Sequence, residues 1–328
     1  MTERIAAIDI GTVTCRMLVA DVVDGRVVEL AKEYAITNLG EGVDATGELK
    51  PEAMQRVADT IDRYISVRDS FIDENHPAIK TVTVATSASR DAANADEFAQ
   101  LLACRGIELS VIPGEREAAL SFAGASSDFA GERIMVVDIG GGSTEVIVGE
   151  AGQTPEKSHS FNIGCRRVTE RFIHSDPPSS EEMRAARAWI REGMGWFFDD
   201  LRKGDGCEAC CTEEVSKGSG VDRVVAVAGT ATSVVSIREQ MTVYDSARVH
   251  GALVTADELR EVTELLAGIP LAQRECVVGL DPKRAPVITA GMLILEETLT
   301  LAGASSFTAS ESDILQGIVL AASQDGIA

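Results

Sequence analysis

One short pattern occurs twice in the chain, about 130 residues apart, and it constrains the fold more than any other feature. Each copy consists of an apolar stretch, Asp-Ile-Gly, small residues that include hydroxyl groups, and a second apolar stretch. The first copy covers residues 5–19 and the second covers residues 133–148. The period is too long for a solenoid, so it indicates two similar α/β lobes. A chain of 328 residues also exceeds the size that one hydrophobic core usually serves.

The lobe boundary is expected near residue 124, where the sequence becomes small and polar. We predict a first lobe over residues 1–123, completed by a C-terminal helix over 312–323. The second lobe is predicted over residues 124–311.

The first lobe is predicted to begin with three antiparallel strands. Asp24-Gly25 between the second and third strands is typical of a two-residue hairpin turn. Pro51 favours the first turn of a helix, in which Met54, Val57, Ile61 and Ile65 have helical spacing. The predicted strands cover 5–10, 17–23, 27–34, 81–85 and 107–112, and further helices cover 95–102 and 115–123.

The second lobe is predicted to be richer in helices. A long helix over 180–201 is expected to be interrupted at Gly193 and Gly195, and residues 203–220 are expected to form an exposed loop. The other predicted elements are strands at 221–228 and 305–309, helices at 256–267 and 285–301, and a last helix from residue 312.

The chain is strongly acidic, with 30 basic and 52 acidic side chains and a formal net charge of −22. This charge repels nucleic acid and anionic membranes, so neither is expected as a partner. A polyanionic ligand would need cations or a local basic cluster such as Arg166-Arg167. We find no signal peptide and no segment with the apolar length of a membrane span. The expected location is the cytoplasm.

Seven cysteines lie mostly in apolar segments, so they are expected to be reduced, buried thiols. The exceptions are Cys207, Cys210 and Cys211, which lie in a polar stretch. A metal or redox role would want a second ligand pair or a nearby His, and neither follows in the sequence. We assign these three cysteines no function.

The repeated Asp-Ile-Gly turns are predicted to bind phosphate. Glycine accepts the backbone angles that let several N–H groups converge on one anion, and hydroxyl groups add donors. A strand that runs through Gly229 into a helix would add a third anion-binding loop. The alternative is that these glycines serve only hairpin and strand–helix turns. The loop residues predicted to bind phosphate are Gly11, Thr12, Thr14, Gly140, Gly141, Gly142, Ser143, Thr144, Gly229 and Thr230.

Carboxylates beside these turns are predicted to hold a divalent metal. Asp138 ends a buried strand, and Glu145 points to the opposite face from Thr144. Mg²⁺ prefers few carboxylates and several waters, so Asp9, Asp138 and Glu145 form the predicted ligand set for Mg²⁺ or Mn²⁺.

These motifs resemble the phosphate loops of the actin, hexokinase and heat-shock chaperone superfamily. More narrowly, the chain resembles the exopolyphosphatase and guanosine pentaphosphate phosphatase (Ppx/GppA) family. The resemblance implies an α/β fold with two ribonuclease H-like domains of the actin-like ATPase superfold and an active-site cleft between them. It covers essentially the whole chain, and its narrower motifs lie at 86–94, 113–118, 162–172 and 279–288.

The resemblance also implies residue roles. Glu117 matches the carboxylate that acts as general base toward the attacking water, and Arg90 matches a cleft arginine that can grip phosphate oxygens. Arg16 and Arg166, or Arg167 in place of the latter, are implied as further phosphate ligands. Without the family, Glu117 would be interpreted as a carboxylate placed favourably in the first turn of a helix.

The chain departs from the family pattern at two positions of the predicted site. Val13 stands where the family usually has Asn, which removes a polar group from the first phosphate loop. Arg116 stands where Glu commonly precedes the catalytic carboxylate; it would weaken Glu117 as a base or help to hold an anionic substrate. The chain resembles the short, two-domain form, which lacks the extra C-terminal helical region of longer members and for which a homodimer is one possibility.

The leading functional prediction is an Mg²⁺-dependent phosphohydrolase that releases terminal phosphate from inorganic polyphosphate. Hydrolysis of guanosine pentaphosphate is the first alternative, and the acidic charge favours such smaller substrates. A sugar or acetate kinase on the same superfold would need an acceptor. A catalytically weak regulator that binds guanosine polyphosphates, favoured by Val13 and Arg116, is the alternative from another class.

Overall fold

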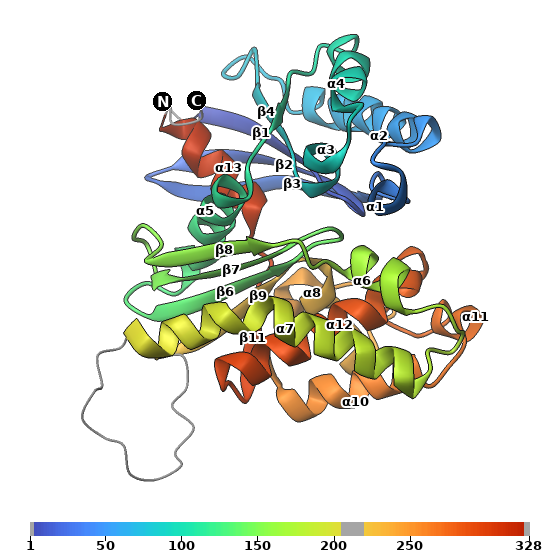
Figure 1. Cartoon of the computed structure of the whole chain (residues 1–328). Coiled ribbons are helices and arrows are strands. Elements are labelled where there is room, and N and C mark those ends of the chain that lie inside the picture. Colours follow the sequence, from blue (N-terminus) through green and yellow to red (C-terminus); the bar gives the residue numbers. More distant parts are fainter. Residues whose placement is uncertain (1–2, 205–219, 325–328) are drawn as a thin grey trace. The chain divides into compact units, whose positions relative to one another are not determined.

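The structure is a computed structural model that describes residues 3–204 and 220–324 (Figure 1). It divides into two compact units. Unit 1 consists of the described residues of Met1–Ser127, Gly140–Gly142 and Ser312–Ala328, and unit 2 of those of Asp128–Ile139 and Ser143–Glu311. Three glycines therefore belong to unit 1, although the strands on both sides of them belong to unit 2.

Unit 1 contains a five-stranded sheet with the order β3-β2-β1-β4-β5. β1, β2 and β3 are antiparallel neighbours, whereas β4 and β5 continue the sheet in parallel from β1. This is the strand arrangement of a ribonuclease H-like domain, as predicted. The strands are β1 (Glu3–Ile10), β2 (Thr14–Val23), β3 (Arg26–Ile36), β4 (Lys80–Ala85) and β5 (Leu109–Val111).

The turn between β2 and β3 confirms the predicted hairpin. Val23 pairs with Arg26, so the connection has two residues. Asp24 and Gly25 have φ of 50° and 75°, and a tight hairpin turn that matches the strand twist needs positive φ at both positions.

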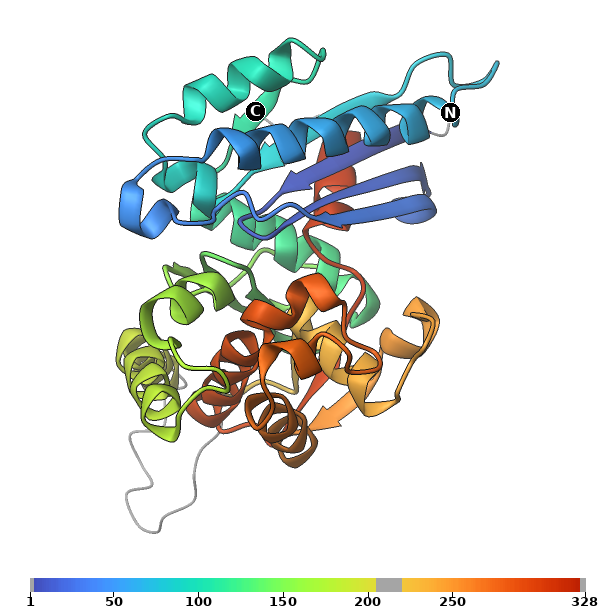
Figure 2. The same ribbon diagram turned by 90° about the vertical axis from the view of Figure 1, so that its right-hand side faces the viewer.

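The apolar run of β1 follows from burial on both faces. Ala6, Ile8 and Ile10 pack in a cluster with residues of α2 and α4, while Ile5 and Ala7 pack with α5 and α13. A strand covered on both faces needs no polar alternation. Figure 2 shows α2 lying along one face of this sheet. The helices of unit 1 are α1 (Val43–Thr46), α2 (Pro51–Asp69), α3 (Ser87–Asp91), α4 (Ala95–Ala103), α5 (Gly114–Ala125) and α13 (Ile314–Ser323).

Two glycines let α5 and α13 pack backbone against backbone (Figure 1). A Cβ atom on Gly317 would lie 2.7 Å from the carbonyl carbon of Leu120, and closer still to its oxygen. A Cβ atom on Gly124 would lie 2.8 Å from the carbonyl carbon of Asp313. Only glycine fits at these positions, so the last helix is tightly joined to α5.

Unit 2 repeats the topology of unit 1. Its sheet has the order β10-β11-β9-β6-β7-β8, with β6, β7 and β8 antiparallel and β9 and β11 parallel to β6. β10 is an additional antiparallel edge strand. The shared topology confirms the internal repeat as a structural one. The strands are β6 (Arg133–Ile139), β7 (Thr144–Glu150), β8 (Lys157–Phe161), β9 (Arg223–Val227), β10 (Leu253–Thr255) and β11 (Ser306–Ala309).

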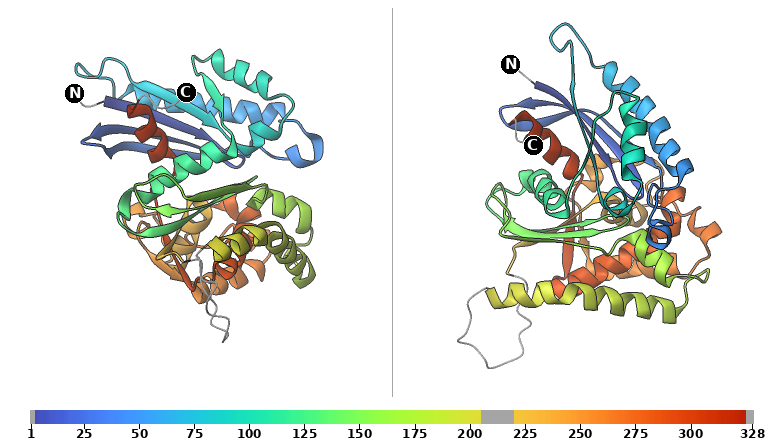
Figure 3. Two further views of the ribbon diagram at one scale, coloured as in Figure 1. Left: turned by 60° about the vertical axis from the view of Figure 1, so that its left-hand side comes forward. Right: turned by 45° about the horizontal axis from the view of Figure 1, so that its top comes forward.

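The prediction that glycines interrupt the long helix was wrong. α7 (Ser180–Gly204) runs unbroken through Gly193 and Gly195 (Figure 3). Its buried side chains include Ile190, Met194 and Phe197, and this burial outweighs the low helix propensity of glycine. The other helical elements of unit 2 are η1 (Ser126–Asp128), which begins in unit 1, α6 (Cys165–Phe172), α8 (Ala228–Arg238), α9 (Ser246–Val249), α10 (Ala256–Ala267), α11 (Leu271–Arg274), η2 (Pro282–Arg284) and α12 (Ala285–Ala302).

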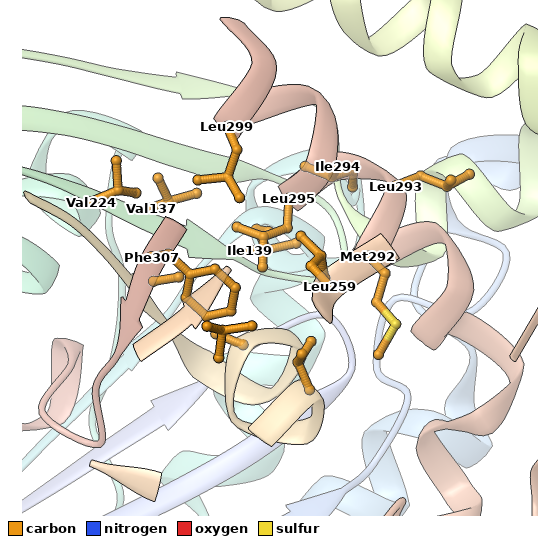
Figure 4. Packing of buried hydrophobic residues seen from close by; sticks show 14 of the residues in the cluster. Val137, Ile139, Val224, Leu259, Met292, Leu293, Ile294, Leu295, Leu299 and Phe307 are labelled. Atoms are coloured by element: carbon orange, nitrogen blue, oxygen red, sulfur yellow. The ribbon is translucent and has the colours of Figure 1, made fainter. Parts of the chain in front are cut away.

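α12 is the central helix of unit 2. Leu295 and Leu299 lie near Val137 and Ile139 of β6, and Phe307 of β11 lies beside them (Figure 4). The prediction that no segment has the apolar length of a membrane span was wrong. The helix over residues 282–302 is long and apolar enough by length and composition. In this structure 78% of the apolar window is buried, since the helix packs in the core.

The cysteine prediction holds for half of the described cysteines. Cys15 and Cys165 are buried and free, as expected, and burial raises the pKa of both thiols. Cys104 and Cys276 are exposed; Cys104 directly follows α4, and Cys276 lies two residues after α11. Cys207, Cys210 and Cys211 lie outside the described residues.

Candidate functional site

The first predicted phosphate loop connects β1 and β2 in unit 1. The Gly11 amide donates to the carbonyl oxygen of Thr14 at 2.8 Å, which closes a tight turn. The loop also supports the following segment, because Thr37 N and Asn38 N both donate to Val13 O at 2.9 Å. The loop is therefore held at both ends by backbone hydrogen bonds.

The Gly-rich loop Gly140–Gly142 contacts the first loop within unit 1. A Cβ atom on Gly141 would lie 2.5 Å from Val13 Cγ2 and 2.9 Å from Thr12 Cβ, and one on Gly142 would lie 2.9 Å from Thr12 Oγ1 and closer still to Ser87 Oγ. Val13 is buried in this contact. The structure thus brings the two predicted loops together, and it gives Val13 a packing role there.

Asp9, Arg16 and Asp313 form an ion-pair network beside the first loop. Arg16 Nε and Nη2 donate to Asp9 Oδ2 at 3.1 and 2.6 Å, and Arg16 Nη1 donates to Asp313 Oδ2. Burial raises the pKa of Asp9, Arg16 opposes this effect, and the charge of Asp313 adds to it. Asp9 was predicted to bind metal and Arg16 phosphate; here they neutralise each other.

Glu117 lies in the first turn of α5 and is buried, with 8% of the residue exposed. Arg90 Nη1 donates to Glu117 Oε2 at 2.7 Å and to the carbonyl oxygen of Ile112 at 2.9 Å. A carboxylate placed only for the helix dipole would face solvent, so burial against an arginine indicates a more specific role. Arg90 holds Glu117 here, and its contact with phosphate remains a prediction.

α3 connects the two features just described. It carries Ser87, which contacts Gly142, and Arg90, which holds Glu117. A helix of one turn therefore places the buried carboxylate and the Gly-rich loop within one part of unit 1.

Asp138 and Glu145 face each other across β6 and β7 in unit 2. Opposed residues of an antiparallel pair have side chains on the same face of the sheet, and both residues are buried. Ser160 Oγ donates to Glu145 Oε1 at 2.6 Å. Thr144 projects from the other face, as predicted, and its hydroxyl donates to the carbonyl oxygen of Ile163 at 2.5 Å.

Asp138 and Glu145 are the two predicted metal ligands that lie together in unit 2. Over residues 3–204 and 220–324 no group of three or more His, Cys, Asp or Glu side chains is arranged to hold a metal ion. Mg²⁺ is commonly bound through one or two carboxylates together with water and substrate phosphates. The Asp138–Glu145 pair places two carboxylates on one face of the sheet, and Mg²⁺ binding there remains a prediction.

The third predicted loop opens α8 in unit 2, where the guanidinium of Arg284 lies directly against Gly229. Arg284 also donates to Ser233 Oγ at 3.4 Å. Arg166 pairs with Glu170 one turn along α6 at 3.2 Å. Burial raises the pKa of the Cys165 thiol, and the charges of Arg166 and Arg284 oppose this effect.

No role was predicted from the sequence for Arg284 or Asp313. Arg284 lies within the family-like segment 279–288, which was a signal that could have identified it. From the sequence, Asp313 could have been recognised only as an Asp that precedes a helix. Its contact with Arg16 was not predictable, because the two residues are 297 positions apart. Ser143 and Thr230 are buried in unit 2, close to their predicted loops.

Comparison with known proteins identifies the family. A model of the Ppx/GppA phosphatase family matches residues 18–322. Exopolyphosphatase 2 of Mycobacterium tuberculosis is 38% identical over 97% of this chain and 98% of its own length. The crystal structure of an exopolyphosphatase-like protein has a TM-score of 0.84 at 29% identity and covers 97% of both chains. That of the Aquifex aeolicus family member has a TM-score of 0.76 at 26% identity, with 99% of each chain covered. The chain therefore belongs to the Ppx/GppA phosphatase family and is a hydrolase of phosphoanhydride bonds.

Proposed function

We propose that this protein is an Mg²⁺-dependent exopolyphosphatase that releases terminal orthophosphate from inorganic polyphosphate. The observation that carries the proposal is the buried Glu117 carboxylate, held by Arg90 on the same short helix that contacts the Gly-rich loop. Phosphoryl transfer depends mainly on positioning, charge neutralisation and an oriented nucleophile, and this arrangement can provide the last of these.

The loops would bind the phosphate chain through backbone amides and hydroxyl groups. The Gly11 amide closes the first loop on Thr14, so the other amides of this loop and those of Gly140–Gly142 would bind phosphate, and Thr12 adds a hydroxyl at their contact. Arg16 lies at the end of the first loop, where its guanidinium can exchange a carboxylate partner for a phosphate oxygen. In unit 2, Gly229 and Arg284 together would form a further anion-binding position.

Glu117 would act as the general base. Its carboxylate accepts a proton from the attacking water as a new bond forms between the water oxygen and the terminal phosphorus. The bond from that phosphorus to the bridging oxygen breaks, and the shortened chain leaves on that oxygen and takes a proton from solvent. Arg90 limits the movement of Glu117 because one nitrogen donates to both the carboxylate and the Ile112 carbonyl.

Asp138 and Glu145 of unit 2 would hold the divalent cation. Bound Mg²⁺ neutralises charge on the phosphate oxygens and helps to align the group that is transferred. Asp9, the third predicted metal ligand, lies in unit 1 and is paired with Arg16. The acidic chain needs such neutralisation, because its net charge of −22 opposes the approach of any polyphosphate.

Guanosine pentaphosphate is the second candidate substrate. The acidic charge favours a shorter polyanion over a long polyphosphate. The regulatory alternative rests on Val13 and Arg116. The contact of Val13 with Gly141 argues against the regulatory alternative, because Val13 supports the structure of the loop there.

We also propose that the protein acts in the cytoplasm as a homodimer, without nucleic acid or membrane as a partner. Light scattering of the purified protein measures the oligomeric state directly. Monomers at micromolar concentration would contradict the dimer.

The test is phosphate release with Mg²⁺ from long polyphosphate, tripolyphosphate and guanosine pentaphosphate, using wild type and Glu117→Gln in parallel. We expect release from polyphosphate by the wild type only, with binding retained in the variant. Release from guanosine pentaphosphate alone would select the second candidate. Binding without release by either protein would refute the enzymatic proposal in favour of the regulator.

A further inference from the structure

Asp313 uses its two carboxylate oxygens for two different contacts. Oδ1 accepts a hydrogen bond from Leu315 N at 3.0 Å and caps the N-terminus of α13, with Gln316 completing a capping box. Oδ2 accepts from Arg16 Nη1. Capping alone would be satisfied by Ser, Asn or Asp, so it does not account for the charge or for the second oxygen.

The position of Asp313 is tightly constrained by the packing of the last helix. The carbonyl group of Asp313 lies against Gly124 of α5, and Gly317 lies against Leu120 of the same helix. Both contacts are between backbones, which cannot rotate away as flexible side chains can. Asp313 is therefore a rigid anchor, fixed to the helix that carries Glu117.

Two carboxylates accept hydrogen bonds from the guanidinium of Arg16. Asp9 accepts from Nε and Nη2, and Asp313 accepts from the remaining terminal nitrogen, Nη1. The side chains of Asp9 and Asp313 are each 5% exposed, and that of Arg16 is 15% exposed. All three side chains are largely shielded from solvent, so the removal of one carboxylate should change the mobility of the guanidinium.

We propose that Asp313 is a positioning residue for Arg16, holding its guanidinium at the first phosphate loop in an orientation set by α5 and α13. This inference rests on the proposed function, because Arg16 is there a ligand of substrate phosphate. When Arg16 exchanges its contact with Asp9 for a phosphate oxygen, the contact with Asp313 keeps the guanidinium in place, so little side-chain entropy is lost. The residue acts through Arg16 and need not touch the substrate.

The variants Asp313→Asn and Asp313→Ser separate this role from helix capping. Both retain a good N-cap oxygen, but neither supplies a charged partner to Arg16. We expect the KM for tripolyphosphate to rise about tenfold in each, with kcat changed less than about twofold, because the lost contribution acts on ground state and transition state alike. In an Arg16→Gln background, Asp313→Asn should raise KM no further.

A nuclear magnetic resonance measurement tests the same proposal without activity. The Nε–H resonance of Arg16 is assigned by its loss in Arg16→Lys. In the wild type, this proton should exchange slowly with solvent. It should exchange faster in Asp313→Asn and Asp313→Ser.

Unchanged exchange in both variants would overturn the positioning role, as would an equal rise of KM in the Arg16→Gln background. Failure of the proposed function gives a different result. The wild type would then release no phosphate from any substrate, while Arg16 exchange would still respond to Asp313.

Discussion

Gly317→Ala tests whether the close packing of α5 and α13 is a major source of stability. The added Cβ would lie 2.7 Å from the carbonyl carbon of Leu120, whereas ordinary van der Waals contact begins at 3.4 Å. The helices would have to separate by about 0.7 Å or more, because the obstructing group is backbone. Separation would loosen the packing of Leu315 and Ile318, which are fully buried against Ile5 and Leu18.

The expected cost combines two opposing effects. Overpacking of a well-packed contact costs about 1–3 kcal/mol, and more when backbone must move. Alanine in a helix interior gains about 1 kcal/mol over glycine. We therefore expect Gly317→Ala to reduce the free energy of unfolding by about 2 kcal/mol. Gly195→Ala is the matched control, because a Cβ there meets nothing within 4 Å.

The two variants should differ in sign. Gly195→Ala should stabilise the protein by up to about 1 kcal/mol through helix propensity alone. Urea unfolding followed by far-UV circular dichroism measures both, since the two tryptophans, Trp189 and Trp196, lie in α7 of unit 2 and do not report on α13. A Gly317→Ala protein as stable as wild type, or a Gly195→Ala protein less stable than wild type, would refute this reasoning.

Three further predictions concern the candidate site and the hydrogen-bonded Glu182 carboxylate of unit 2. Gly142→Ala should weaken substrate binding at least tenfold, because the added Cβ would clash with Thr12 Oγ1 and Ser87. Isothermal titration calorimetry with polyphosphate, in a Glu117→Gln background that does not hydrolyse it, measures the affinity. An unchanged affinity would contradict a role for this contact in binding. Arg90→Gln should lower kcat by about 10²-fold or more by releasing Glu117, and a kcat within threefold of wild type would remove Arg90 from the mechanism. The pKa of Glu182 is lowered to about 2, chiefly by a hydrogen bond from Ser175, so its stabilising contribution is present above pH 4.5 and is lost as the pH falls toward 2. Glu182→Gln should therefore lower Tm at pH 7 but not at pH 2, and equal losses at both would contradict the linkage.

Local chemistry was sufficient for the family and for most strands, but not for the strands β8 and β10 at the two edges of the sheet in unit 2. Apolar runs, the Asp24-Gly25 turn and Pro51 act through nearby backbone angles and burial, so their consequences were predictable from the sequence. The repeated Asp-Ile-Gly pattern correctly indicated two similar domains, because each copy specifies one strand–turn–strand unit.

Tertiary structure decided the contacts between distant segments. Propensity predicted a break at Gly193 and Gly195, but the burial of one face of α7 outweighs about 1 kcal/mol per glycine. The motifs named Glu117 and Arg90 separately, and only the fold shows that one holds the other. Asp313 meets Arg16 across 297 positions because two glycines let α13 approach α5. No local pattern specifies such a meeting, since the free energy that fixes it comes from packing in the folded chain.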